Sequence, residues 1–218
     1  DLSENLSISQ FYRISVSSQN SSIVAGGLQD NGGFSYNGKK WTNYHGGDGM
    51  EGVIDPTNEN TQYGFTQYGG SLNRTSNKGA SLSLQIDAPS GETGTNDAGG
   101  EWVTPMASDS KGKIFAGYSQ LYKLANSSWN KVSDHNFGGD DIDCVEIDPT
   151  NDNIIYVSQA KGLYKSIDAG VTFIKLSYNG QKINSMEISN SDSNVLWIVT
   201  NNLVYKSVNI KDDNPTFG

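Results

Sequence analysis

A repeated motif places the strongest constraint on the fold of this chain. The segments VIDPTNENTQY (53–63) and EIDPTNDNIIY (146–156) are near copies, each with a strand end, a turn and the start of a second strand. Weaker copies of the second strand follow in register, with spacings of 39, 52, 41 and 41 residues. The aligned positions are Val24, Tyr63, Phe115, Tyr156 and Trp197. A mean period of about 43 residues is typical of the four-stranded blades of a β-propeller.

We therefore predict an all-β fold, a single propeller segment over residues 1–218 with about five four-stranded blades. The approximate blade ranges are 8–45, 46–87, 101–134, 141–178 and 183–218. Segment 88–100 is rich in Gly and Thr without apolar periodicity, and we interpret it as a mobile insertion. The last range stops where its fourth strand should begin. We therefore expect part of a larger propeller, for example a seven-bladed one, rather than a tightly closed ring of five.

Charge and hydropathy exclude several classes of partner. The chain has 15 Lys and Arg against 24 Asp and Glu, a net charge of −9, so we expect no nucleic-acid partner. No apolar run approaches the roughly 18 residues of a membrane helix, so no membrane insertion is expected. The first residues lack the apolar region of a signal peptide, so a leader of a secreted form would be removed or lie outside this sequence. Cys144 is the only cysteine, which excludes an internal disulfide, and we expect a buried thiol.

The segment SIDAGVTF (166–173) resembles the Asp-box, or BNR repeat, of sialidase-like, sortilin-like and xyloglucanase-like propellers. Phe173 stands where that motif has Trp. The segment lies between predicted third and fourth strands, where Asp168 can accept backbone N–H bonds and Gly170 can take a positive φ. We expect Phe173 to pack beneath this turn. The motif is a folding element, so it implies no activity.

Four further strings are similar to secreted propellers of environmental and gut Bacteroidetes, which are commonly labelled glycosyl-hydrolase-like. They are GGLQDNGGF (26–34), GGDGMEGVIDPTN (46–58), TQYGG (66–70) and EWVTP (101–105). The wider relatives of these propellers include xyloglucan-cleaving enzymes. The resemblance implies a secreted, cell-surface or periplasmic location and a polysaccharide or glycan partner. It also places Asp30 at the position of an Asp in the xyloglucanase element G-D-x-G-G-F, and the second family carboxylate falls in a blade that the sequence does not assign.

Two predicted blade-crossing loops share a Gly-Gly-Asp motif, at residues 45–51 and 137–143. In a propeller, these loops emerge on the same face as the turns between second and third strands. Paired glycines allow tight turns that present acidic side chains. The acidic residues so placed are Asp48, Glu51, Asp140, Asp141 and Asp143, with Asp30 from an adjacent turn. A cluster of like charges would raise some of their pKa values.

Asp30 and Asp48 are the candidate catalytic pair. In a two-carboxylate glycosidase, one acid protonates the leaving oxygen and one base activates water. The alternative is that these carboxylates cap turns, accept N–H bonds from the Gly-rich loops, or bind an adventitious Ca²⁺. No other cofactor or metal is expected.

Carbohydrate binding does not need a pair of catalytic carboxylates. It needs aromatic faces that stack on sugar rings and polar groups that bind hydroxyl groups. The candidate ligand-binding residues are Gln29, Tyr44, Glu51, Gln67, Tyr68, Trp102, Asp140 and Asp141. Packing at strand ends is the alternative for the aromatic residues. We expect Trp102 to open an inner strand, and Trp197, within the apolar LWIV segment, to lie in the core.

These observations favour a carbohydrate-binding or scaffold module over two alternatives. One is a xyloglucanase-like glycoside hydrolase, and the other is a sortilin-like propeller that binds a protein or peptide. Sialidase action is disfavoured, because sialidases grip the substrate carboxylate with three arginines and this chain has only Arg13 and Arg74. A Ser-His-Asp triad is equally unsupported, since His45 and His135 are the only histidines and no nucleophile elbow is present.

Overall fold

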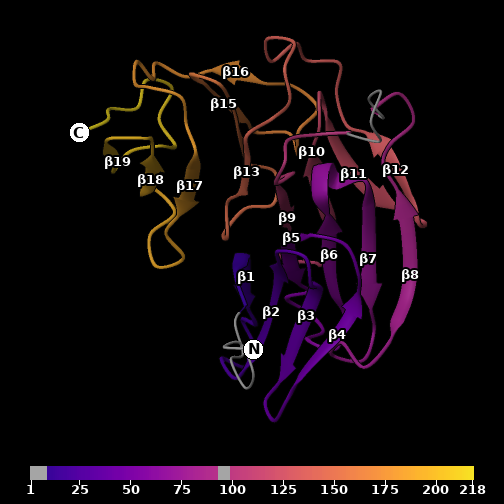
Figure 1. Cartoon of the computed structure of the whole chain (residues 1–218). Helices are drawn as coiled ribbons and strands as arrows, with labels where there is room; N and C mark the ends of the chain where they lie inside the picture. The colour runs from indigo at the N-terminus through magenta and orange to yellow at the C-terminus, as the bar shows by residue number, and fades with distance from the viewer. Residues whose placement is uncertain (1–8, 93–98) are drawn as a thin grey trace. The chain divides into compact units, whose positions relative to one another are not determined.

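A computed structural model describes residues 9–92 and 99–218 of the chain, and these residues form an all-β structure (Figure 1). The one helical element in the described part is a 3₁₀ turn, η1 (Gln67–Gly69). None of the described segments forms a helix with the length and apolar character needed to cross a membrane. The chain divides into two compact units, residues 1–67 with 71–85 and residues 68–70 with 86–218, called unit 1 and unit 2 below.

Unit 1 carries two four-stranded antiparallel sheets in which consecutive strands pair. The strands are β1 (Phe11–Val16), β2 (Ile23–Leu28), β3 (Gly32–Asn37) and β4 (Trp41–His45) in the first sheet, then β5 (Gly49–Ile54), β6 (Gln62–Thr66), β7 (Ser71–Thr75) and β8 (Leu82–Asp87) in the second, the last two residues of β8 belonging to unit 2. Ile23 and Ala25 of β2 form a buried cluster with Ile54 of β5, which joins the two sheets.

Unit 2 carries three sheets with the same consecutive antiparallel pairing. The strands are β9 (Met106–Ser108), β10 (Ile114–Gly117), β11 (Leu121–Ala125) and β12 (Ser128–Lys131), then β13 (Cys144–Ile147), β14 (Ile155–Gln159), β15 (Gly162–Ser166) and β16 (Ile174–Lys175), and finally β17 (Ser185–Ile188), β18 (Leu196–Val199) and β19 (Val204–Ser207). The chain returns to β19 at its last residue, where Gly218 exchanges two backbone hydrogen bonds of 2.8 and 3.0 Å with Lys206 of β19.

These sheets are the blades of a β-propeller, as the repeat predicts. Each of the five aligned positions falls on the second strand of its sheet, namely β2, β6, β10, β14 and β18. The predicted register is therefore confirmed. The last sheet has three strands, which agrees with the expectation that range 183–218 stops where its fourth strand should begin.

The Asp-Pro-Thr-Asn segments form the same turn in both copies. Asp55 Oδ1 accepts hydrogen bonds from the backbone N–H and the hydroxyl of Thr57 at 2.8 and 2.7 Å. Asp148 Oδ1 accepts the same two bonds from Thr150 at the same distances. A side chain that satisfies the backbone two residues later stabilises a turn without help from the rest of the fold. The local sequence therefore favours these turns, and in the second copy Lys211 Nζ also forms an ion pair with Asp148 Oδ2 at 2.8 Å.

The segment SIDAGVTF forms the turn between β15 and β16. Asp168 accepts hydrogen bonds from the Thr172 N–H at 2.8 Å and the Thr172 hydroxyl at 2.6 Å. These bonds to its charged form lower the pKa of Asp168. Gly170 has φ 91°, and Phe173 is buried at 8% exposure. The predicted positions of all three residues in this turn are confirmed.

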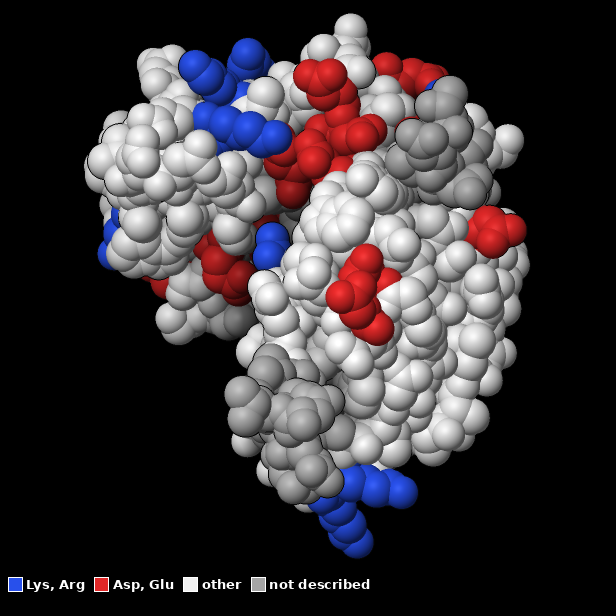
Figure 2. Space-filling model, in the orientation of Figure 1, with Lys and Arg blue, Asp and Glu red and all other residues white. Residues whose placement is uncertain are grey.

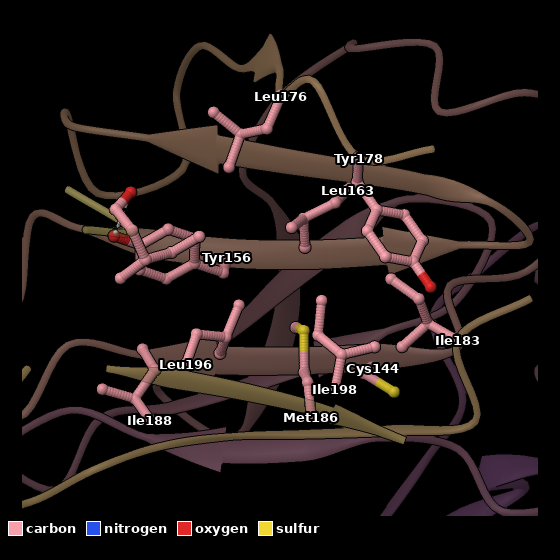
Figure 3. Packing of buried hydrophobic residues seen from close by; sticks show 11 residues of the cluster. Cys144, Tyr156, Leu163, Leu176, Tyr178, Ile183, Met186, Ile188, Leu196 and Ile198 are labelled. Atoms are coloured by element: carbon pink, nitrogen blue, oxygen red, sulfur yellow. Dashed lines mark hydrogen bonds between the residues drawn. The ribbon is translucent and has the colours of Figure 1, made fainter. Parts of the chain in front are cut away.

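A hydrophobic core joins the fourth and fifth sheets (Figure 3). It includes Cys144, Tyr156, Leu163, Leu176, Tyr178, Ile183, Met186, Ile188, Leu196 and Ile198. Cys144 is buried, as predicted. Trp197 is not in the core, because Leu196 and Ile198 fill it and the two-residue period of β18 turns Trp197 to the other face. Its side chain is 43% exposed, with Lys206 Nζ 4.8 Å from the ring centroid.

Candidate functional site

A cleft of about 490 Å³ lies within unit 2. Two aromatic side chains, four carboxylates, one amide and one ammonium line it. The lining segments are the β6–β7 and β14–β15 turns and the chain that crosses between successive sheets around residues 100–102, 139–143 and 182. These are the two classes of loop that the sequence places on one face. Their convergence is confirmed for this part of the molecule.

Tyr68 and Trp102 form the aromatic wall of the cleft. Their rings meet edge to face, with centroids 4.9 Å apart and planes at 82°. Tyr68 has a left-handed backbone with φ 58°, and its N–H donates to Trp102 O at 3.2 Å. The Trp102 side chain remains 38% exposed. Trp102 does not open an inner strand as predicted, since β9 begins four residues later at Met106.

Asp143 and Lys182 link two segments that line the cleft. Asp143 Oδ2 accepts the Ala160 N–H at 2.5 Å, and Asp143 Oδ1 lies 2.8 Å from Lys182 Nζ. Lys182 Nζ also lies 3.7 Å from a Glu101 oxygen. The hydrogen bond to Asp143 is the largest contribution that raises the pKa of Lys182, so this ammonium stays charged. The Asp143 carboxylate is therefore engaged by the protein itself.

Asp140 and Asp141 also line the cleft, and neither carboxylate has an ion pair or hydrogen bond with the described residues. Burial raises the pKa of Asp141 to about 6, with further contributions from nearby carboxylates, first that of Glu101. Acidic side chains gather in the upper part of Figure 2, over unit 2, with lysines beside them. The cleft thus holds two carboxylates that no described residue neutralises, and one of them, Asp141, has a pKa of about 6.

Gln159, at the end of β14, supplies an amide to the cleft. The residue is 6% exposed, yet within the described residues its amide group has no hydrogen-bond partner. A Cβ atom on Gly138 would lie 2.7 Å from Gln159 Oε1, so the glycine makes room for the amide. Because this amide lines the cleft and no described residue binds it, Gln159 is a candidate for contact with a ligand.

Glu92 anchors the start of the predicted insertion to the third sheet. Its carboxylate accepts hydrogen bonds from Ser119 N–H at 3.1 Å, Ser119 Oγ at 2.7 Å and Tyr122 OH at 2.7 Å. Its charge also contributes to the raised pKa of Asp141. The flanks of the insertion are therefore fixed by hydrogen bonds, while the predicted mobility of residues 93–98 lies outside the described residues.

The predicted catalytic pair lies in unit 1. Asp48 Oδ1 accepts the backbone N–H of Asp30 at 2.7 Å, and Asp30 has φ 59°. Gln67 joins them, because its N–H donates to Asp48 O at 3.1 Å and its Oε1 accepts the Asp48 N–H at 3.2 Å. The structure therefore brings these three predicted residues together. The contact between Asp48 and Asp30 has the geometry of a turn cap.

The other predicted residues of unit 1 differ in their exposure. Tyr44 is 5% exposed, so its ring offers no face for stacking, and burial raises its pKa. Glu51 Oε2 lies 3.6 Å from Arg13 Nε, and Gln29 is exposed beside the β2–β3 turn. Of the predicted ligand residues, Tyr68, Trp102, Asp140 and Asp141 line the cleft of unit 2.

Sequence reasoning did not single out Glu101 or Lys182. Glu101 precedes Trp102 in the EWVTP string, so its position in the same loop was a usable signal. Lys182 lies between β16 and β17 in a segment with no recognisable motif. Among residues 9–92 and 99–218, no group of three His, Cys, Asp or Glu side chains is arranged to hold a metal ion.

Solved structures with this fold include three glycoside hydrolase family 74 (GH74) proteins. A GH74 enzyme from Niastella koreensis is 16% identical, with a TM-score of 0.69 over 94% of this chain and 37% of that one. A GH74 xyloglucanase from Xanthomonas campestris is also 16% identical, with a TM-score of 0.69 over 94% and 38% of the chains. An ancestral GH74 enzyme is 19% identical, with a TM-score of 0.71 over 96% and 31%.

This chain shares its propeller fold with GH74 enzymes. It spans only 31% to 38% of their length. No protein-family model matches the sequence, and no curated protein matches it either. Since identity is below 20%, the likeness extends to the fold and not to an activity.

Proposed function

We propose that this chain is an extracytoplasmic carbohydrate-binding module and that the cleft of unit 2 is its glycan site. The observation that carries the proposal is that the exposed Trp102 and the half-buried Tyr68 share one cleft with polar groups. Aromatic faces stack on the C–H faces of pyranose rings, and carboxylates and amides bind the hydroxyl groups. The fold shared with glycoside hydrolases supports a polysaccharide as partner.

A binding screen against plant and microbial polysaccharides tests this proposal. Trp102→Ala should weaken binding of the selected glycan by at least about tenfold, because stacking area is lost. Trp197→Ala is the matched control, since Trp197 is similarly exposed in unit 2 but lies outside the cleft. Equal loss in both variants, or binding that survives Trp102→Ala, would refute the assignment of the cleft.

Hydrolysis is the second candidate, and the raised pKa of Asp141 favours it. A glycosidase needs one carboxyl group that is still protonated near neutral pH as its general acid. Asp141, with its pKa near 6, lines the cleft beside Asp140 and Glu101. In this form of the proposal Asp141 is the acid, and a neighbouring carboxylate serves as base or nucleophile.

Release of reducing ends from a bound polysaccharide separates the two candidates. Asp141→Asn should lower release by at least about a hundredfold if Asp141 is the general acid. Asp30→Asn and Asp48→Asn test the pair in unit 1. Loss of release in these two variants but not in Asp141→Asn would move the chemistry to unit 1. If the unmodified protein binds the polysaccharide but releases no reducing ends, hydrolysis is excluded and the binding module remains as the proposed function.

A further inference from the structure

The cleft in unit 2 has more acidic side chains than the binding of a neutral glycan requires. Its lining holds four carboxylates, from Glu101, Asp140, Asp141 and Asp143, and a single ammonium, from Lys182. Lys182 is already bound to Asp143 at 2.8 Å and lies 3.7 Å from Glu101. The cleft therefore keeps an excess of negative charge after its internal ion pairs are counted.

Asp140 and Asp141 carry this excess. Neither has a cationic partner among the residues that the structure describes. The burial of Asp141 reduces the water that could otherwise screen it. Two adjacent carboxylates without a counter-ion repel each other, and a ligand that brings positive charge would relieve this repulsion.

Gln159 and the aromatic pair show that the cleft is not merely acidic. Gln159 is 6% exposed as a residue, its side chain lines the cleft, and its amide has no partner among the described residues. An amide both donates and accepts hydrogen bonds, which suits a hydroxyl group better than an inorganic cation. Tyr68 and Trp102 offer ring surface for a sugar. These features favour a ring-shaped ligand with hydroxyl groups over a metal ion or a simple amine.

We propose that the cleft of unit 2 selects glycans with free, protonated amino groups, such as de-N-acetylated amino-sugar oligosaccharides. Asp140 and Asp141 bind the ammonium groups, Gln159 binds a ring hydroxyl, and Tyr68 or Trp102 stacks on the ring. A neutral glycan would leave both carboxylates without a charged partner, so it binds less tightly. This inference rests on the proposed glycan-binding function and names its ligand class.

Calorimetric titration of the intact chain with three hexasaccharides of β-1,4-linked glucose or glucosamine tests the inference at about pH 6, where an aliphatic amine is protonated. The ligands are a glucosamine hexamer, its fully N-acetylated form and cellohexaose. The glucosamine hexamer should bind at least about tenfold more tightly than the two neutral ligands. Added salt should reduce this difference, because it screens charge and leaves stacking unchanged.

The double variant Asp140→Asn with Asp141→Asn should remove the preference for charge, so that it binds the glucosamine hexamer no more tightly than it binds cellohexaose. Asp213→Asn is the matched control, since this carboxylate has 93% side-chain exposure and does not line the cleft. Titration with a linear oligoamine that has the same charge as the glucosamine hexamer separates recognition of the sugar from general attraction to an acidic protein.

The outcomes are distinguishable. Equal affinity for all three hexasaccharides would overturn the charge selectivity and keep the proposed function. Equal affinity for the oligoamine and the glucosamine hexamer would overturn the recognition of a sugar. Failure of every carbohydrate to bind would overturn the proposed function and this inference together. Circular dichroism of each variant confirms that it is folded.

Discussion

The two Gly-Gly-Asp loops have similar sequences and different surroundings. In unit 1, the loop at 45–51 packs backbone against backbone, because a Cβ on Gly49 would lie 2.1 Å from Gly32 O. In unit 2, a Cβ on Gly139 would meet no atom within 4 Å. The carboxylate of Asp48 caps the backbone of Asp30, whereas Asp140 lines a cleft without a partner. The same motif therefore serves packing in one place and leaves acidic groups available in the other.

The comparison teaches that neighbours decide the role of an acidic turn. A carboxylate that accepts a hydrogen bond from a nearby N–H group contributes to stability and is not free for a ligand. A carboxylate that burial and like charges leave unsatisfied is available for binding or proton transfer. Four sets of variants test this contrast, from the largest expected effect to the smallest.

Gly49→Ala should destabilise the chain most, by at least about 3 kcal/mol, because the new Cβ collides with the Gly32 backbone, which cannot move aside. Gly139→Ala should cost only about 1 kcal/mol, from its φ of 96° alone. Urea unfolding measures both. Gly46→Ala, where a Cβ meets nothing within 4 Å, is the neutral control. Equal effects at Gly49 and Gly139 would remove the contrast between the loops.

Asp143→Ala should lower the free energy of unfolding by about 2 kcal/mol. The Ala160 N–H loses its acceptor and Lys182 loses its shorter ion pair. Asp143→Asn should have a smaller effect, since its amide oxygen can still accept from Ala160. Thermal unfolding followed by circular dichroism compares the three proteins. An unchanged midpoint in Asp143→Ala would show that this carboxylate does not hold the two segments together.

Asp48→Ala should cost about 1 kcal/mol, because the Asp30 N–H loses its cap. Asp140→Ala should change stability by less than about 0.5 kcal/mol, since its carboxylate has no described partner. Urea unfolding under identical conditions gives both values. The reverse order would mean that the second loop, and not the first, depends on its acidic side chain for stability.

Asp141→Asn should change the free energy of unfolding only above the acidic pH range. The pKa of Asp141 in the folded chain is raised to about 6, so folding favours its protonated form. The unmodified chain loses this contribution as pH rises toward and through about 6, whereas Asn does not titrate. The variant should therefore match the parent near pH 3.5 and be more stable at pH 8, by less than about 1 kcal/mol after solvent screening. A stability difference that is constant across this range would contradict the raised pKa.

The sequence predicted the strand order and register because its signals are local and repeated. The turns of Asp55 and Asp148 satisfy their own backbones, and the strands alternate with a period of two. Rules for propeller loops then predicted that Asp30 would lie near Asp48, and that Tyr68, Trp102 and the second acidic loop would converge. The assignment of a catalytic role to Asp30 and Asp48 stays a prediction.

Side-chain environments were not predictable in the same way. Tyr44 precedes a polar loop in the sequence, yet tertiary packing buries it at 5% exposure. Trp197 belongs to an apolar strand, yet it lies on the exposed face. Lys182 reaches Asp143 from the segment before the next sheet, and no local pattern marks that contact. Each case depends on which face of a strand or loop meets a neighbour that is distant in sequence.

The left-handed backbone of Tyr68 has a consequence for recognition of a ligand. A non-glycine residue with φ 58° is held by surrounding contacts, here including the hydrogen bond to Trp102 O. The backbone that carries the Tyr68 ring is thus set when the chain folds. Under the proposed function, a glycan would not have to reorder this backbone on binding, so less affinity would be lost to ordering.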